Sequence, residues 1–204
     1  MIAIVDYGVG NLFSLTSSFA AIGQEVVVTA DPRVLEAADK ILLPGVGAFG
    51  DAADKLRATG LDKTLVQLAN AGKPLMGICL GMQLLFEEGH EYGIHKGLGL
   101  IPGKVVAMKN VIPQELKIPH MGWNALDFQK ESPLFAHIKH RDCVYFVHSY
   151  YATECDQAVI ATAEYGAMLT AAVQKGNVFG CQFHPEKSGT VGLNILRAFA
   201  EMEG

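Results

Sequence analysis

Short apolar runs alternate with helix-like patterns through the first half of the chain, and no other feature of the sequence restricts the fold as strongly. The apolar runs that predict buried strands are residues 1–6, 25–29, 40–43 and 74–78. Apolar positions at helical spacing predict helices in residues 11–22 and 61–69, and helix-prone residues 80–88 follow the fourth strand. This order is typical of a parallel sheet covered by helices on both faces.

The second half of the chain changes to closely spaced strand-like runs. They are residues 98–108, 143–147, 159–163, 169–174 and 178–182. Little chain separates the later runs, which indicates hairpins at a mixed sheet edge, and residues 189–202 then form an amphipathic helix. Neither an internal repeat nor a linker interrupts the pattern. We therefore expect an α/β fold with a three-layer, open, mixed and mostly parallel sheet, flanked by helices, in a single domain over residues 1–204.

Charge and cysteine usage narrow the class of protein. A formal net charge of −5 argues against a general nucleic-acid or membrane-surface binder. The most obvious uncharged apolar run, residues 74–86, is too short to span a bilayer as a helix. The chain starts without a basic leader or signal-like segment, and its four cysteines lie far apart with no CxxC pair. These features predict a cytoplasmic protein with free thiols.

Metal-like spacing occurs twice, in His137-x-x-His140 and Cys181-x-x-His184. Neither pair has a matching second pair nearby, as a structural zinc site would require. We therefore expect no metal site and no cofactor.

The stretch GICLG places Cys79 between Gly77 and Gly81, after a predicted strand and before a predicted helix. One interpretation is an ordinary core cysteine, since free cysteines are usually buried and inert. The other is a nucleophile elbow, a sharp strand-to-helix turn that presents a strained and exposed thiol. In that case the backbone N–H of Leu80 is available to an oxyanion.

A thiol nucleophile needs a base, and the base needs a group that orients it. His184 and Glu186 are two residues apart and follow a predicted strand, so their side chains point to the same side of an extended segment. Glu186 would then fix the tautomer of His184. The alternative is a surface histidine and a solvated glutamate in a proline turn.

A glycine-rich loop after the third strand supplies a further candidate element. Gly45, Val46 and Gly47 follow Pro44, and the two glycines allow a peptide N–H to turn outward as a second oxyanion donor. An ordinary βα loop is the alternative, because the segment lacks the spacing of a phosphate-binding loop.

These three elements, in this order, resemble the oxyanion, nucleophile and base motifs of the class I, triad-type glutamine amidotransferases, and they span most of the chain. Four further stretches narrow the resemblance to the glutaminase subunits of imidazole glycerol phosphate synthases, which act in histidine biosynthesis. They are DYGVGNL (6–12), KIPHMGWN (117–124), HSYY (148–151) and HPEKSG (184–189).

The resemblance implies an enzyme that hydrolyses L-glutamine to glutamate and ammonia through a thioester on Cys79, with His184 and Glu186 as base and orienter. It also implies that glutamine contacts a set of five residues: Gln83, Glu91, His148, Ser149 and Tyr150. The residues alone also allow simpler interpretations: Gln83 as an amide on a helix surface and Glu91 as an exposed carboxylate. Ser149 and Tyr150 would then belong to a buried strand.

The resemblance further implies a heterodimer with a (β/α)₈-barrel cyclase. The ammonia passes through the core of that partner, which makes imidazole glycerol phosphate and an aminoimidazole carboxamide ribonucleotide. Asn11, Trp123 and Lys187 resemble partner-facing residues. Residues 119–122 suggest a loop, and an aromatic anchor on a loop suits an interface, although the single tryptophan is equally compatible with a core position.

Two rival functions share parts of this pattern. A cysteine hydrolase or peptidase without a synthase partner would have the same elbow but would not need HMGWN or a glutamine pocket. A non-catalytic binding subunit would have a degenerate site, and the intact Cys79, His184 and Glu186 argue against that.

Overall fold

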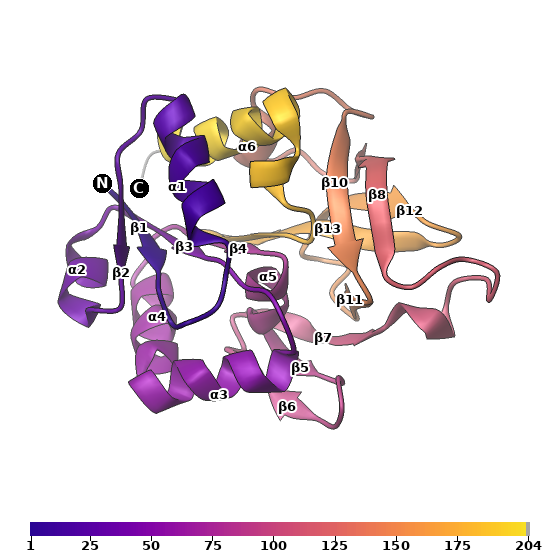
Figure 1. The fold of residues 1–204 in the computed structure, drawn as a ribbon, viewed down its shortest axis with the longest axis horizontal. Helices are drawn as coiled ribbons and strands as arrows, with labels where there is room; N and C mark the ends of the chain where they lie inside the picture. Colours follow the sequence, from indigo (N-terminus) through magenta and orange to yellow (C-terminus); the bar gives the residue numbers. More distant parts are fainter. Residues whose placement is uncertain (203–204) are drawn as a thin grey trace.

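The computed structural model describes residues 1–202 and contains one large mixed sheet between two layers of helices (Figure 1). The sheet has eight strands in the order β2-β1-β3-β4-β14-β13-β12-β9. The strands from β2 to β14 pair in parallel, and those from β14 to β9 pair antiparallel. The strand bounds are β1 Ile2–Val5, β2 Val26–Thr29, β3 Lys40–Leu43, β4 Leu75–Ile78, β9 Asp127–Phe128, β12 Val159–Glu164, β13 Met168–Lys175 and β14 Val178–Cys181.

Two smaller sheets pack beside the large one. The first pairs β8 with β10 antiparallel, and the second has the order β11-β7-β5-β6. Their strands are β5 Phe86–Gly89, β6 His95–Lys96, β7 Ile101–Ala107, β8 His120–Ala125, β10 Cys143–His148 and β11 Tyr150–Thr153. The helices are α1 Leu12–Ala21, α2 Pro32–Ala37, α3 Phe49–Thr59, α4 Leu61–Asn70, α5 Leu80–Leu84 and α6 Gly189–Glu201, with 3₁₀ turns η1 Met108–Asn110, η2 Pro133–Phe135 and η3 Pro185–Lys187.

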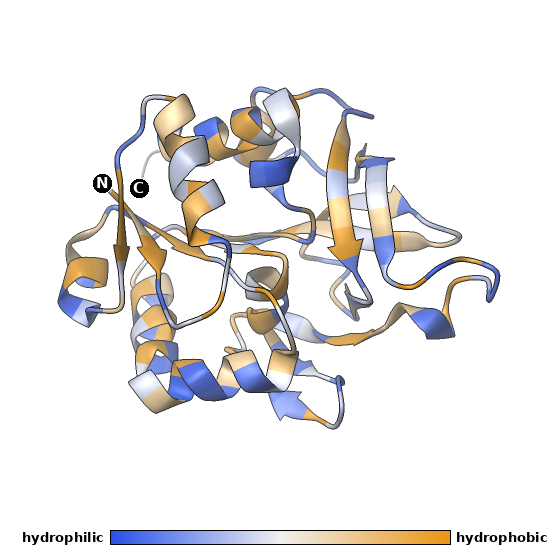
Figure 2. Cartoon of the chain, in the orientation of Figure 1, coloured by the Kyte–Doolittle hydropathy of each residue, from blue (hydrophilic) through white to orange (hydrophobic). Residues whose placement is uncertain are grey.

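The central strands read as continuous apolar runs because both of their faces are buried. In β1, Ile2 and Ile4 pack into the core formed with α1 and α6, whereas Ala3 and Val5 pack into the core formed with α3 and α4. Figure 2 shows β1 coloured hydrophobic along its length and the peripheral β6 coloured hydrophilic. Alternate residues thus serve opposite helix layers, which confirms the expected three-layer α/β fold.

Two predicted elements are wrong. The helix expected over residues 80–88 ends at Leu84, and Phe86–Gly89 forms strand β5 instead. Phe86 pairs with Ile101 of β7, and a Cβ on Gly89 would lie 2.5 Å from the ring of Phe49, so tertiary packing overrides local helix propensity.

The second error concerns residues 119–122, for which the sequence predicts a loop. His120 to Gly122 lie in strand β8, where they pair in register with β10 from His148 to Phe146. The strand begins directly after Pro119, and its large apolar side chains, Met121 and Trp123, lie on the exposed face. It therefore lacks the usual pattern of a half-buried strand, in which the apolar side chains face the core.

No helix among residues 1–202 is long and apolar enough to cross a membrane. The predicted domain over residues 1–204 extends two residues beyond the part that the structure describes.

Candidate active site

Cys79 lies at a sharp turn between β4 and α5, with backbone angles of φ 55° and ψ −113°. A non-glycine residue at positive φ is strained. Both flanking glycines are required for this turn: a Cβ on Gly81 would lie 1.8 Å from the carbonyl oxygen of Leu43, and one on Gly77 would lie 2.5 Å from that of Gly81. The Cys79 N–H donates to the carbonyl of Cys181 at 2.8 Å, which holds the turn against the end of β14.

The thiol is more enclosed than the sequence suggested, since Cys79 is only 8% exposed. It is nevertheless no inert core residue, because it lines a cavity of about 360 Å³. The other lining residues are Val46, Gly47, Leu80, Gln83, Glu91, Pro119, Val147, His148, Ser149, Tyr150, His184 and Lys187. The segments separated in sequence therefore meet around the sulfur.

His184 stands between the thiol and a buried carboxylate. Its Nδ1 donates to Glu186 Oε1 at 2.8 Å, and the side chains are 4% and 2% exposed respectively. Burial by itself would lower the pKa of His184, but hydrogen bonds to Cys79 and Glu186 outweigh it and raise that pKa to about 9. The arrangement holds a protonated imidazole beside the sulfur at neutral pH.

Replacing Glu186 by Gln is expected to lower the pKa of His184 from about 9, because the carboxylate that stabilises the imidazolium is lost. A raised folded-state pKa adds stability that is complete below about pH 6.5 and disappears as the pH rises through 9. As the pH rises from about 6.5 to 9, the free energy of unfolding should therefore decrease more in the wild type than in Glu186→Gln. NMR titration of the His184 ring and urea unfolding measure both effects, and an unchanged titration midpoint would contradict the assigned cause.

The glycine-rich loop reaches the same cavity. Val46 and Gly47 line it together with Leu80, and Gly47 has φ +97°. A Cβ on Gly45 would lie 2.7 Å from the backbone nitrogen of Gly81, so this glycine is needed for the loop to touch the elbow. The structure thus brings both predicted sources of oxyanion donors to one cavity.

Gln83 is buried and is not a helix-surface amide. Its Nε2 donates to the carbonyl of Tyr150 at 3.2 Å and to Gln182 Oε1 at 3.0 Å. The Nδ1 of His148 donates to the same carbonyl at 2.8 Å, and burial lowers the pKa of His148 to about 4. His148 is therefore a neutral, rigidly held part of the cavity wall.

Glu91 is half-buried at the cavity and also has a structural contact. Its Oε2 accepts a hydrogen bond from the N–H of Phe49 at 2.8 Å, at the first residue of α3. An acidic group at this end of a helix is favourable. Ser149 lies between β10 and β11 and lines the same cavity.

The three residues expected to face a partner lie in different elements. Asn11 caps α1 by accepting from the N–H of Ser14 at 3.3 Å. Trp123 on β8 is 56% exposed and packs edge-on against Tyr145 of β10 at 5.9 Å. Lys187 is exposed and lines the cavity. The exposure of Trp123 excludes the core position.

Two residues, one beside the thiol and one beside His184, were not recognised in the sequence. Gln182 is fully buried, and its Nε2 lies 3.7 Å from Cys79 Sγ. Ser188 accepts from the N–H of Tyr145 at 2.9 Å and donates to the carbonyl of His184 at 2.6 Å. The sequence did contain a sign of Gln182. It lies two residues before His184, and Glu186 lies two residues after, so in an extended segment all three side chains point to the same side.

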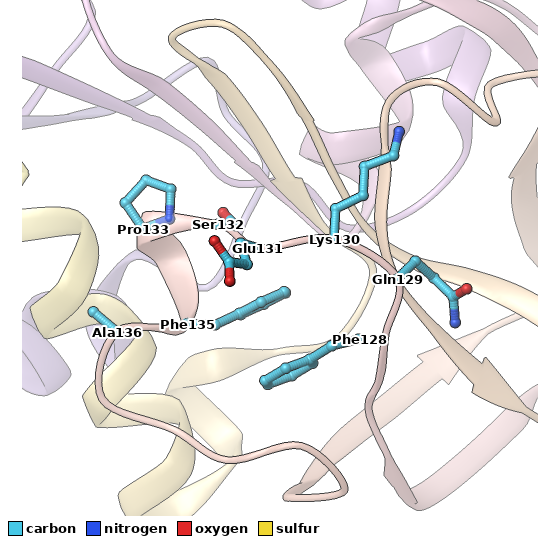
Figure 3. Close-up of a pocket in the computed structure, with 8 residues that line it drawn as sticks. All are labelled: Phe128, Gln129, Lys130, Glu131, Ser132, Pro133, Phe135 and Ala136. Atoms are coloured by element: carbon cyan, nitrogen blue, oxygen red, sulfur yellow. The ribbon is translucent and has the colours of Figure 1, made fainter.

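A larger hollow, of about 730 Å³, lies elsewhere on the molecule (Figure 3). It is lined by residues 128–133, 135 and 136, and Phe128 stacks on Phe135 within it at 4.3 Å. It contains none of the predicted site residues. Among residues 1–202, no three His, Cys, Asp or Glu side chains are grouped so that they could hold a metal ion.

The family model for class-I glutamine amidotransferases matches residues 3–202. The chain belongs to the class-I glutamine amidotransferase family. It is 48% identical to the imidazole glycerol phosphate synthase subunit HisH of Syntrophotalea carbinolica, over 99% of this chain and 100% of that protein. The HisH subunit of Bacillus subtilis is 49% identical over 99% of this chain and 96% of its own length. This amidotransferase therefore belongs among the HisH subunits, as the four narrower motifs predicted.

Solved structures of other glutamine amidotransferases have the same fold. A crystal structure titled glutamine amidotransferase has a TM-score of 0.76 at 19% identity and covers 98% of both chains. The structure of PurLQS from Thermotoga maritima has a TM-score of 0.75 at 20% identity, over 98% of this chain and 96% of that one. At this level of identity the likeness concerns the fold alone.

Proposed function

We propose that this amidotransferase hydrolyses L-glutamine at Cys79 and delivers the ammonia to a cyclase subunit of imidazole glycerol phosphate synthase. The observation that carries the proposal is the strained Cys79 at the cavity wall, hydrogen-bonded to a His184 that Glu186 orients. These are the nucleophile, base and orienter of a thiol-dependent acyl transfer. The HisH relatives are named as subunits of that synthase.

In the proposed reaction, the Cys79 thiolate attacks the side-chain amide carbon of glutamine. Backbone N–H groups of Leu80 and of the loop at Val46 and Gly47 stabilise the oxyanion. His184 protonates the departing ammonia, which leaves a γ-glutamyl thioester on the sulfur. His184 then takes a proton from water, and the hydroxide that forms attacks the thioester carbon, which releases glutamate and regenerates the Cys79 thiolate beside the protonated His184.

The substrate would occupy the cavity beside the sulfur. Glu91 supplies a negative charge for the α-ammonium group, and Ser149 and Tyr150 supply polar atoms for the α-carboxylate end. Gln83 and His148 define the remaining polar wall. A volume of about 360 Å³ is at the lower end of small-molecule sites and suits a single amino acid.

An exposed apolar surface next to the cavity suits the cyclase partner. Ile118, Met121 and Trp123 are exposed along β8 and the segment before it. Pro119 and Lys187 line the cavity, so a partner docked here would cover the mouth from which ammonia leaves. We propose a (β/α)₈-barrel cyclase as this partner, and a single domain over the whole chain.

Replacing Trp123 by Ala should weaken the complex with the cyclase by about 30-fold, the effect of losing a central aromatic anchor. Isothermal titration calorimetry measures the Kd. Val28→Ala, on the β2 edge of the large sheet, is the matched control and should leave the Kd unchanged. Equal affinities for Trp123→Ala and the wild type would remove β8 from the interface.

A single assay separates this function from its rivals. Glutamate release from glutamine is measured with and without the purified cyclase and its nucleotide substrate. Release that requires the cyclase supports the proposal. Glutamate release at the same rate without the cyclase favours an independent hydrolase. No glutamate release under any condition favours a non-catalytic subunit.

The free thiols support a proposal about the cellular compartment. All four cysteines are free, and Cys143 is exposed. A reducing environment keeps such thiols unpaired. We therefore place the proposed activity in the cytoplasm.

A further inference from the structure

Gln182 is the most completely buried polar side chain near the thiol, at 0% exposure. It follows β14 directly, and its backbone N–H donates to the carbonyl of Ala171 at 2.8 Å. Its side chain spans the gap between two groups: Oε1 lies 3.0 Å from Gln83 Nε2, and Nε2 lies 3.7 Å from Cys79 Sγ. A buried amide with both ends engaged is held in one conformation.

The direction of these hydrogen bonds is determined by the carbonyl of Tyr150. A carbonyl only accepts, so Gln83 must turn its NH₂ group toward it. The same NH₂ group reaches Gln182, which must therefore present its oxygen to Gln83. The NH₂ group of Gln182 is left facing the sulfur, and no other orientation satisfies the three bonds.

Apart from the protonated His184, the other neighbours of the sulfur do not favour a negative charge on it. The carbonyl of Val147 lies 4.0 Å from Sγ and accepts from the neutral thiol. Tyr7 donates its hydroxyl to the carbonyl of Pro44 at 2.8 Å, and burial together with the charge of Cys79 raises the pKa of Tyr7. Burial likewise raises the pKa of Cys181. Among residues 1–202, Gln182 is thus, apart from His184, the side chain that donates a hydrogen bond to the sulfur.

We propose that Gln182 is a positioning residue that donates an N–H to the Cys79 sulfur and stabilises its thiolate form. Gln83 orients Gln182, and Tyr150 orients Gln83, so the thiol is connected by side-chain amides to the wall of the substrate cavity. The proposal deepens the proposed glutaminase activity and rests on it for its catalytic meaning. The ionisation of the thiol can be measured without glutamine.

The test is the pH dependence of iodoacetamide alkylation at Cys79, followed by mass spectrometry of the peptide that contains it. Gln182→Met keeps the side-chain length and removes the donor, and it is expected to raise the alkylation midpoint by roughly one pH unit. The turnover number for glutamine should fall about tenfold, with KM little changed. Alkylation of the exposed Cys143 in the same samples is the internal reference.

Gln83→Met provides a second, independent variant, because Gln182 then loses the partner that orients it. Its midpoint should shift in the same direction, and the shifts of the double variant should be less than additive. Gln67→Met, on the exposed side of α4, is the matched control and should shift nothing.

An unchanged alkylation midpoint in folded Gln182→Met would overturn the proposal, as would an unchanged midpoint in Gln83→Met if Gln182→Met does not fold. Thermal unfolding establishes which case applies. If the wild type with cyclase released no glutamate, the proposed function would fail. The alkylation midpoints would still decide whether Gln182 stabilises the thiolate.

Discussion

Replacing Cys79 by Ala is expected to lower glutamine hydrolysis in the complex with the cyclase by about 10⁴-fold or more, because the covalent intermediate cannot form. The fold should remain, since the side chain is small and lines a cavity. Glutamate release, measured by a coupled dehydrogenase assay, tests the activity. Cys143→Ala, which removes an exposed thiol outside the cavity, should retain full activity.

The strained backbone makes a second variant informative. Cys79 has φ 55°, a conformation that glycine adopts without strain. Cys79→Gly should therefore be inactive yet more stable than Cys79→Ala by about 1 kcal/mol. Urea unfolding of the two variants measures the difference. Residual turnover in either variant near the wild-type rate would refute the role of the thiol, and equal stabilities would show that the turn relaxes.

Replacing Gly81 by Ala is expected to lower the unfolding free energy by about 3 kcal/mol or more, because the added Cβ overlaps the carbonyl of Leu43 at 1.8 Å. Both groups belong to the junction of the elbow with β3, where little movement is available. Activity should be lost together with stability, since the displaced turn carries Cys79.

Gly23→Ala is the control that separates overlap from backbone strain. Gly23 has φ +74°, but a Cβ there meets nothing within 4 Å. This substitution should cost about 1 kcal/mol from the positive φ alone. Thermal and urea unfolding measure both variants, and equal losses at Gly23 and Gly81 would contradict the overlap.

The central strands of the large sheet were predictable because burial on both faces makes them continuous apolar runs, whereas the two-residue edge strand β9 was not predicted. The predicted residues 40–43 coincide with β3, and the terminal helix ends within a residue of its predicted end. Helices α2 and α3 were not predicted. The buried face of α3 includes Gly50, Ala52 and Ala53, small residues that give a weak apolar pattern.

The small sheets were harder to predict. Strand β5 depends on pairing with β7, which lies outside the local stretch of sequence, so residues 86–89 carried only the local preference of a helix. Strand β8 includes Gly122 with φ +152°, and its apolar Met121 and Trp123 are exposed, so it did not show the apolar-inward pattern that identifies a half-buried strand.

The site was predictable wherever a side chain follows a strand of the large sheet, since parallel strands end at one edge. Cys79 and His184 follow β4 and β14, which are neighbours. The hydrogen bond from Phe49 to Glu91 and the amide chain through Gln182 could not be predicted, because they depend on side-chain packing across three segments.

The two-stranded β8–β10 ribbon shortens the path between the proposed docking surface and the proposed base, His184. Trp123 is paired with Tyr145, the N–H of Tyr145 donates to Ser188, and Ser188 donates to the carbonyl of His184. Four residues connected by direct contacts thus join the outer surface to the backbone of His184. A subunit that immobilises Trp123 would restrain the base through this relay, and the same ribbon ends at His148 in the substrate wall.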